Sequence, residues 1–137
     1  MSYLIDTNIV SELRKGRRCN PGVASWFAQV ASAEIYLSVL TLGELRRGIE
    51  NIRRRDVPAA EALETWFQEL SASNTDRILP VDQEIAERWG RYSVPDPLPV
   101  LDGLLAATAA KHGLMLVTRN VKDVERTGVA CINPFSG

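Results

Sequence analysis

Five short apolar runs alternate with amphipathic, helix-like patterns along this chain, and this alternation limits the folds it can adopt. Each run has the length of a strand and shows little apolar–polar alternation, which is typical of strands buried on both faces. The helical patterns between them supply the crossovers that parallel strands require. We therefore predict an α/β fold, a three-layer α/β/α sandwich with a central parallel sheet. The runs are Tyr3–Ile5, Ile35–Val39, Ile78–Val81, Leu114–Val117 and Val129–Ile132.

Two stretches have the apolar spacing of amphipathic helices. The second runs from Asp82 to Tyr92 and carries Ile85, Ala86 and Trp89. We interpret both stripes as protein core or subunit interface. No repeat, low-complexity tract or change of composition marks a boundary, so residues 1–137 are predicted to form a single domain. The first stripe consists of Val57, Ala60, Leu63, Trp66, Phe67 and Leu70.

The composition excludes several classes of protein. A chain of 137 residues, 45% of them hydrophobic, is long enough to bury one core. The net charge of -1 gives no overall attraction for nucleic acid, so such a partner requires local basic patches or a metal. Cys19 and Cys131 have no spaced partner, and nothing resembles a secretory signal or a membrane span. We expect a cytoplasmic protein that makes no membrane contact.

Four acidic residues, Asp6, Glu44, Asp102 and Asp123, stand where strand-like runs or loops give way to helix or loop. Parallel strands place their carboxyl ends at one edge of a sheet, where ligands bind in open α/β folds. The four carboxylates are therefore predicted to converge. Two unit charges about 4 Å apart repel by about 4 kcal/mol at an effective dielectric of about 20, a cost that a divalent cation removes. Without metal, we expect a raised pKa in at least one of them.

Each acid also has a purely structural interpretation, which stays open at this point. Asp6 can cap the helix that follows it, and Thr41 with Glu44 fits the T-x-x-E pattern of a capping box. Asp102 can complement the dipole of the next helix, and Asp123 can be an ordinary first-turn acid. A structural account gives no reason for an acid at every one of these turns.

Oxygen ligands without a well-placed histidine or thiolate favour Mg²⁺, for which Mn²⁺ can substitute. Asp6 and Asp102 are the predicted direct ligands, because a short side chain at the end of an element is held firmly. Glu44 can ligate the ion, act through water or cap its own helix, and Asp123 can hold a second ion or orient the attacking water. Neutral neighbours are predicted to orient the carboxylates or to touch phosphate, although the first two can equally be caps; they are Thr7, Asn8, Thr118 and Asn120.

Four sequence blocks follow one another along the chain: LIDTN, SVLTLGELRRGI, LDGLLAATAAKHG, and LVTRNVKD followed by NPF. Together they resemble a PIN-domain toxin ribonuclease of the VapC type, in its FitB-like branch. The resemblance implies an α/β/α fold, Mg²⁺-dependent endoribonuclease activity, a homodimer, and neutralisation by a cognate antitoxin that also binds operator DNA. It places the family's acidic quartet on Asp6, Glu44, Asp102 and Asp123.

Two positions depart from the family pattern. Gly103 stands where alanine is common, and we expect it to loosen the start of its helix. Val124 stands where phenylalanine is frequent, and it removes aromatic packing beside Asp123. The implied chemistry is Mg²⁺-assisted hydrolysis of a phosphodiester. Since this chemistry needs no 2′-hydroxyl, the choice of RNA over DNA rests on the resemblance.

Two basic runs lie close in sequence to the predicted ligands, at residues 14–18 and 46–55. They can line a groove for the nucleic-acid backbone, form a solvated helix face or receive the antitoxin tail. We assign nucleic-acid or antitoxin contact to Arg46 and Arg47. Neither run has aromatic residues interleaved for base stacking, so sequence-specific recognition of bases is not indicated.

Two other functions stay open. The chain can be a weakly catalytic or non-catalytic binding subunit of a DNA-bound toxin–antitoxin regulatory complex. A phosphatase of the haloacid-dehalogenase type also begins with an aspartate after a strand, but it needs a second aspartate two positions on, where this chain has Asn8. The single histidine, His112, lies far from any Ser or Cys motif, which argues against a triad hydrolase.

Overall fold

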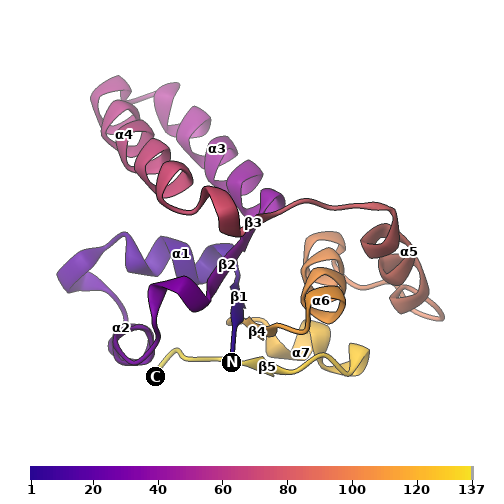
Figure 1. The fold of residues 1–137 in the computed structure, drawn as a ribbon. Helices are drawn as coiled ribbons and strands as arrows, with labels where there is room; N and C mark the ends of the chain where they lie inside the picture. Colours follow the sequence, from indigo (N-terminus) through magenta and orange to yellow (C-terminus); the bar gives the residue numbers. More distant parts are fainter. Residues whose placement is uncertain (137) are drawn as a thin grey trace.

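A parallel sheet forms the centre of the computed structural model, which describes residues 1–136 (Figure 1). Within these residues the sheet has five strands in the order β3-β2-β1-β4-β5, so β1 lies in the middle. Every neighbouring pair is parallel, which confirms the predicted α/β fold. All five strands fall within the predicted apolar runs: β1 (Tyr3–Ile5), β2 (Ile35–Ser38), β3 (Ile78–Leu79), β4 (Met115–Val117) and β5 (Cys131–Ile132).

Helices cover both faces of the sheet and complete the three layers (Figure 1). On one side lie α1 (Thr7–Leu13), α2 (Pro21–Ala28), α3 (Val39–Arg53) and α4 (Val57–Ser73). On the other side lie α5 (Gln83–Tyr92), α6 (Val100–His112) and α7 (Val121–Val124). None of the helices within residues 1–136 has the length and apolar character needed to cross a bilayer. Short 3-10 turns complete the chain: η1 (Gly16–Arg18), η2 (Ser32–Glu34), η3 (Thr75–Arg77) and η4 (Glu125–Thr127).

The sheet separates two apolar cores because side chains alternate across a strand. Leu4 of β1 points to the core beneath α6 and α7, and its neighbour Ile5 points to the core beneath α1 and α2. Both side chains are almost fully buried. The central strand is therefore held from both faces, which fixes the position of the residue that follows it. The first core also contains Leu105, Ala106, Ala109, Leu114, Leu116 and Val124, and the second Ile9, Val10, Val23, Ile35, Leu37 and Val117.

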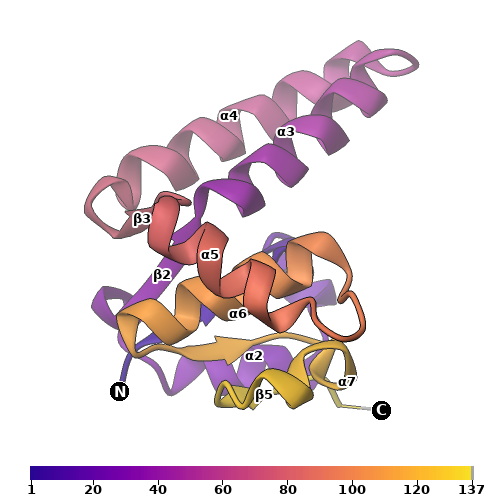
Figure 2. The same cartoon turned by 90° about the vertical axis from the view of Figure 1, so that its right-hand side faces the viewer.

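Helices α3 and α4 form an antiparallel hairpin that projects away from the rest of the molecule (Figure 2). Its inner end is anchored where Trp66 and Leu70 pack against the core beneath α1 and α2. The predicted stripe on α4 is wrong at Val57, which is 55% exposed because it lies at the first turn of α4, next to the outer turn of the hairpin. On α5 the prediction holds for Ile85, but Ala86 is exposed on the other side of that helix.

Helices α5 and α6 pack closely at Gly103. A Cβ atom built there would stand 2.9 Å from Cδ1 of Trp89 on α5 and 3.5 Å from Cδ1 of Leu98. Gly103 is itself buried inside a helix that runs without a break from Val100. The glycine therefore permits close packing of α6 against α5, and the expectation that it loosens the helix start is wrong.

Alanine at Gly103 is expected to lower the free energy of unfolding by about 1–3 kcal/mol, because overpacking against the Trp89 ring outweighs the gain in helix propensity. Gly90→Ala on α5 is the matched control, since a Cβ there meets nothing within 4 Å. That control should be neutral or stabilising by up to about 1 kcal/mol. Urea denaturation measures both, and equal stability of the two variants would contradict the packing argument.

Candidate active site

The predicted acids lie at the carboxyl edge of the sheet. Asp6 directly follows β1, and its amide donates to the carbonyl of Val117 on β4 at 3.0 Å. Glu44 lies on α3, which begins directly after β2, and Asp102 and Asp123 lie in the first turns of α6 and α7. The four acids thus belong to α3, α6, α7 and the N-cap of α1, and they approach the carboxyl end of the central strand β1.

Asp6 is a buried carboxylate with several hydrogen-bond donors. Only 5% of the residue is exposed. Its Oδ1 accepts from the Thr7 amide at 2.6 Å, and its Oδ2 accepts from Thr118 Oγ1 at 2.7 Å and from Asn8 Nδ2 at 3.3 Å. Burial raises the pKa of Asp6 and the charge of Glu44 adds to that, although these hydrogen bonds oppose the shift. Asp6 is also the N-cap of α1, so this residue caps a helix and belongs to the acidic cluster at the same time.

Glu44 faces the site from the second turn of α3. Its Oε1 accepts a hydrogen bond of 2.5 Å from Thr7 Oγ1. The capping-box interpretation of Thr41 and Glu44 is wrong, because Ser38 caps α3 with a 3.0 Å bond from the Leu40 amide to its hydroxyl. Thr41 is buried within the helix, and its hydroxyl has no partner among the described residues. Glu44 therefore has no capping role in its own helix.

Asp102 lies near both Asp6 and Asp123, at the point where the acids approach one another. The pKa of Asp102 is raised from 3.8 to about 6, first by burial and then by the negative charges of Asp6 and Asp123. A contact with Asn120 acts in the opposite direction. The pKa values of both Asp6 and Asp102 are thus raised by burial and by neighbouring acids, which is the direction expected when carboxylates gather without a cation.

The structure thus brings the four acids near one another in succession: Glu44 lies near Asp6, Asp6 near Asp102, and Asp102 near Asp123. The neutral neighbours tie them to one another and to the strand ends. Thr118 is buried, bonds Asp6 through its hydroxyl and accepts from the Asn120 amide at 3.0 Å. Within residues 1–136, no three acidic, cysteine or histidine side chains already stand in positions to enclose an ion.

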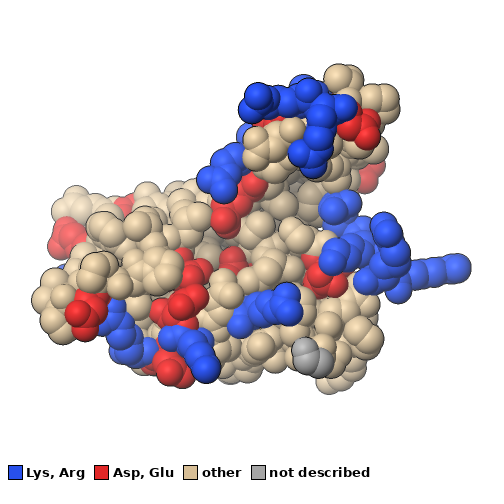
Figure 3. All heavy atoms as spheres, turned by 180° about the vertical axis from the view of Figure 1, so that it is seen from behind, with Lys and Arg blue, Asp and Glu red and all other residues tan. Residues whose placement is uncertain are grey.

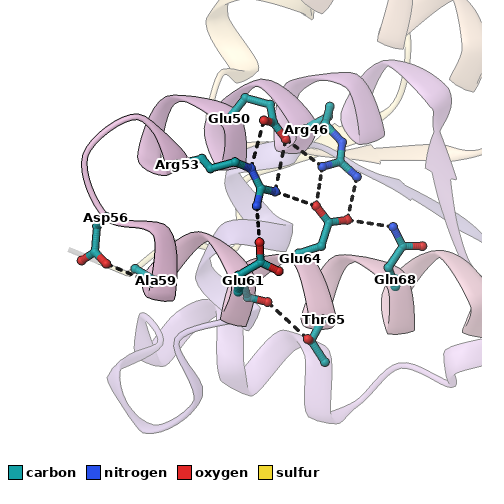
Figure 4. Close-up of polar contacts among 9 residues, drawn as sticks. All are labelled: Arg46, Glu50, Arg53, Asp56, Ala59, Glu61, Glu64, Thr65 and Gln68. Atoms are coloured by element: carbon teal, nitrogen blue, oxygen red, sulfur yellow. Dashed lines mark hydrogen bonds and ion pairs between the residues drawn. The ribbon is translucent and has the colours of Figure 1, made fainter.

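The arginines assigned to partner contact differ from each other. Arg46 binds Glu64 through two hydrogen bonds of 2.6 and 2.8 Å, bonds Glu50 at 3.0 Å and lies 4.8 Å from the Phe67 ring centre (Figure 4). Arg46 is the main reason that the pKa of Glu64 falls to about 2. The Arg46 guanidinium therefore joins α3 to α4, whereas Arg47 is exposed.

A second arginine of the hairpin is also engaged within it. Arg53 pairs with Glu50 at 3.1 Å, Glu61 at 2.5 Å and Glu64 at 2.9 Å, and Gln68 donates to Glu64 at 2.8 Å (Figure 4). A network with several shared partners and bidentate geometry stabilises more than isolated surface pairs do. Part of the basic sequence run is thus neutralised inside the hairpin.

Sequence comparison identifies the family of this chain. A sequence profile of the PIN domain matches residues 3–129. The chain belongs to the PIN-domain family. Toxin FitB of Neisseria gonorrhoeae is 31% identical over 140 residues, covering 96% of this chain and 97% of FitB. VapC ribonuclease Y4jK of Sinorhizobium fredii is 30% identical over 142 residues, which covers 96% of each chain.

Solved structures place this PIN domain with the same relatives. The crystal structure of FitAcB from Neisseria gonorrhoeae matches with a TM-score of 0.87 at 28% identity, covering 96% of this chain and 97% of the other. The structure of FitAB bound to the IR36 DNA fragment matches with a TM-score of 0.77 at 27% identity, over 98% and 96% of the two chains. The family and the α/β/α fold predicted from the sequence are confirmed.

The residues that depart from the family pattern are both buried in well-packed positions of this PIN domain. Val124 is 1% exposed and packs in the core with Leu4 and Leu105, so an aliphatic side chain supports the turn that carries Asp123. Sequence inspection overlooked Arg119, which lies between Thr118 and Asn120. Its amide donates to Asn8 Oδ1 at 3.3 Å, a contact across the chain that no local pattern announces.

Removing the Asp102 charge is expected to stabilise the metal-free protein near neutral pH. Because folding raises this pKa from 3.8 to about 6, the stability that Asp102 contributes is complete below the lower value and is lost as the pH rises through the higher one. The free energy of unfolding of Asp102→Asn, relative to that of the wild type, should therefore rise by on the order of 1 kcal/mol between about pH 4 and 7, after allowance for the partial exposure of Asp102. Urea unfolding in EDTA measures this, and a difference that does not vary with pH would contradict it.

Proposed function

We propose that this PIN domain is a Mg²⁺-dependent endoribonuclease that acts as the toxin of a toxin–antitoxin module. The observation that carries the proposal is the convergence of four carboxylates from separate elements at the carboxyl edge of the sheet. The activity and its biological setting are supported by the relatives, one of which is named a toxin and another a VapC ribonuclease.

The donor set fits a hard divalent cation such as Mg²⁺, with Mn²⁺ as a substitute. All four side chains offer oxygen, and the negative charges of Asp6 and Asp123 help to raise the pKa of Asp102, so a cation would be favoured beside these acids. Asp6 and Asp102 are the proposed ligands, because both lie where the acids converge and Asp6 is held rigidly by Thr118 and Thr7. When bound, the ion supplies an acidified water and stabilises charge on the phosphate.

The other residues of the site have proposed roles that follow from their contacts. Thr7 holds the Glu44 carboxylate in place, so Glu44 serves as a ligand directly or through water. Asp123 is exposed, and this position suits a group that orients or deprotonates the attacking water. Asn8, Thr118 and Asn120 orient the carboxylates or contact phosphate.

The proposed partners are a single-stranded RNA substrate, a cognate antitoxin and, through the antitoxin complex, operator DNA. We also propose a homodimer and a cytoplasmic location. Support for a DNA-bound assembly comes from the match to FitAB bound to the IR36 DNA fragment. The same match favours the second candidate function, a weakly catalytic binding subunit of a DNA-bound regulatory complex.

Cleavage assays separate the two functions. Purified, antitoxin-free protein should cleave single-stranded RNA in single-turnover reactions with Mg²⁺ and not with EDTA. Asp6→Asn and Asp102→Asn should each reduce the rate by at least about 100-fold, because each removes a ligand of the ion. Asp76→Asn is the control, since Asp76 is exposed and pairs only with Arg77 at 3.2 Å. Absence of metal-dependent cleavage in the wild type would favour the binding subunit.

Mg²⁺ should also stabilise the folded protein. An ion that binds only the folded state raises the free energy of unfolding by about 1.4 kcal/mol at about ten times its Kd. Thermal unfolding across millimolar Mg²⁺ is therefore expected to shift upward in the wild type and much less in Asp102→Asn. A wild-type melting temperature that stays constant over this range would count against the metal site independently of any cleavage assay.

A further inference from the structure

Two exposed arginines near the acidic site are held by aromatic rings. The guanidinium carbon of Arg119 lies 4.7 Å from the centre of the Phe135 ring, and that of Arg14 lies 6.0 Å from the Trp66 ring. Stacking on a ring restricts a long side chain while leaving its N–H groups directed outward. Both guanidinium groups are therefore held in position while their N–H groups remain free to donate hydrogen bonds.

Neither arginine is neutralised within the described part of the chain. Arg46 and Arg53 form ion pairs inside the hairpin, whereas Arg14 and Arg119 form none with side chains of residues 1–136. The carboxylate of Glu12 lies near Arg119, but it already accepts hydrogen bonds of 2.6 Å from Lys15 and 2.8 Å from the Asn20 amide. Two charged forks thus remain available for an external anion.

Arg14 is adjacent to the Glu44 side of the acidic site. It ends α1 and lines a cavity of about 150 Å³ between α1 and the α3–α4 hairpin. Thr7 and Glu44, which are bonded to each other, line the same cavity, and the ring of Trp66 forms another part of its wall. A group bound by Arg14 in this cavity would contact the acidic site directly.

Arg119 is adjacent to the site through the loop that follows β4. It lies in the loop after β4 between Thr118, which bonds Asp6, and Asn120, which contacts Asp102. The Arg119 amide is fixed by Asn8 Oδ1. The site therefore has one arginine beside Glu44 and a second in the loop that carries Thr118 and Asn120.

The ring of Phe135 is positioned by the docking of residues 133–136 against α2. Asn20 donates from Nδ2 to the Ser136 carbonyl at 3.0 Å and accepts at Oδ1 from the Ser136 amide at 3.0 Å. Gly22 lies against the same segment, and a Cβ there would collide with the Pro134 carbonyl oxygen. The stack under Arg119 is thus part of an ordered arrangement.

The distribution of charge on the surface indicates that a bound polyanion would need nearby cationic side chains. Figure 3 shows acidic atoms in the hollow between the hairpin and the body, with Lys and Arg atoms on the hairpin and on the body to either side. A polyanion approaching this hollow is repelled by the acids, and the net charge of -1 offers no compensating attraction. Local cationic side chains must therefore hold a bound polyanion in place.

We propose that Arg14 and Arg119 form a clamp that binds two backbone phosphates of a single-stranded RNA, one beside Glu44 and one beside the loop after β4. The clamp rests on the proposed function, because it assigns how that site holds its substrate. A planar guanidinium offers two parallel donors to phosphate, and ring stacking reduces the entropy lost when it binds. The clamp contacts the backbone alone, so it binds without preference for base sequence.

Binding of a short fluorescein-labelled single-stranded RNA of mixed sequence, measured by anisotropy in EDTA, tests the clamp without cleavage. Arg14→Gln and Arg119→Gln should each weaken binding by about 10-fold or more, as expected for a lost charge-assisted hydrogen bond. Each should also reduce the slope of log K against log salt by about 0.7, the value for one phosphate contact on a single strand. Arg91→Gln is the matched control, because Arg91 is exposed at the end of α5 and forms no ion pair within residues 1–136.

Two further variants separate positioning from charge and guard against misfolding. Arg119→Lys keeps the charge but loses the planar fork, so the salt slope should be retained while binding weakens by about 3-fold or more. Phe135→Leu removes the ring under Arg119 without changing any charge, and it should weaken binding to a similar extent at unchanged slope. Melting temperatures within a few degrees of the wild type show that each variant is folded.

The clamp is overturned if Arg14→Gln and Arg119→Gln bind RNA as the Arg91→Gln control does. It is also overturned if both variants lose binding only to an acidic poly-glutamate peptide, which would identify these arginines as a protein-docking site. Failure of the clamp leaves Mg²⁺-dependent cleavage dependent on Asp102. Failure of the proposed function instead leaves RNA binding through both arginines intact and abolishes cleavage in the wild type.

Discussion

The pairing of β1 with β4 is the contact on which the site depends. It aligns Ile5 with Val117, so the next residues, Asp6 and Thr118, emerge side by side at the same edge. The Thr118 hydroxyl then donates to Asp6 within a buried environment, and the Asp6 amide donates back to β4. Apolar cores on both faces hold the two strands in this register. A buried carboxylate is thereby fixed at one point, and the other acids are arranged around it.

Gathering carboxylates in this way works against the stability of the protein without metal. Asp6 and Asp102 both have raised pKa values, because burial disfavours their charged forms and neighbouring acids add repulsion. Helix caps, the Thr7 hydroxyl and the strand-end hydrogen bonds hold the carboxylates close despite this repulsion. A divalent cation would relieve this repulsion, so the repulsion among the acids would itself favour binding of the ion.

Much of this arrangement could be predicted from the sequence, because apolar runs locate the strands and parallel connectivity brings their ends together. The acids at those ends followed from the same logic. Partnerships between distant elements could not be predicted: the bonds from Arg46 to Glu64 join two helices across 18 residues of sequence. The Thr41–Glu44 capping box failed because Ser38 begins the helix one turn earlier. The stacking of Arg119 on Phe135 could not be predicted either, because the two residues are distant in the sequence and meet only in the folded chain.

The projecting hairpin divides the acidic quartet unequally. Glu44 belongs to α3, whereas Asp6, Asp102 and Asp123 are attached to the body around the sheet. The ion pairs of Arg46 and Arg53 make the two hairpin helices a single stiff arm (Figure 4). A partner that displaced the outer end of the hairpin would therefore change the distance between Glu44, at the inner end, and the other three acids.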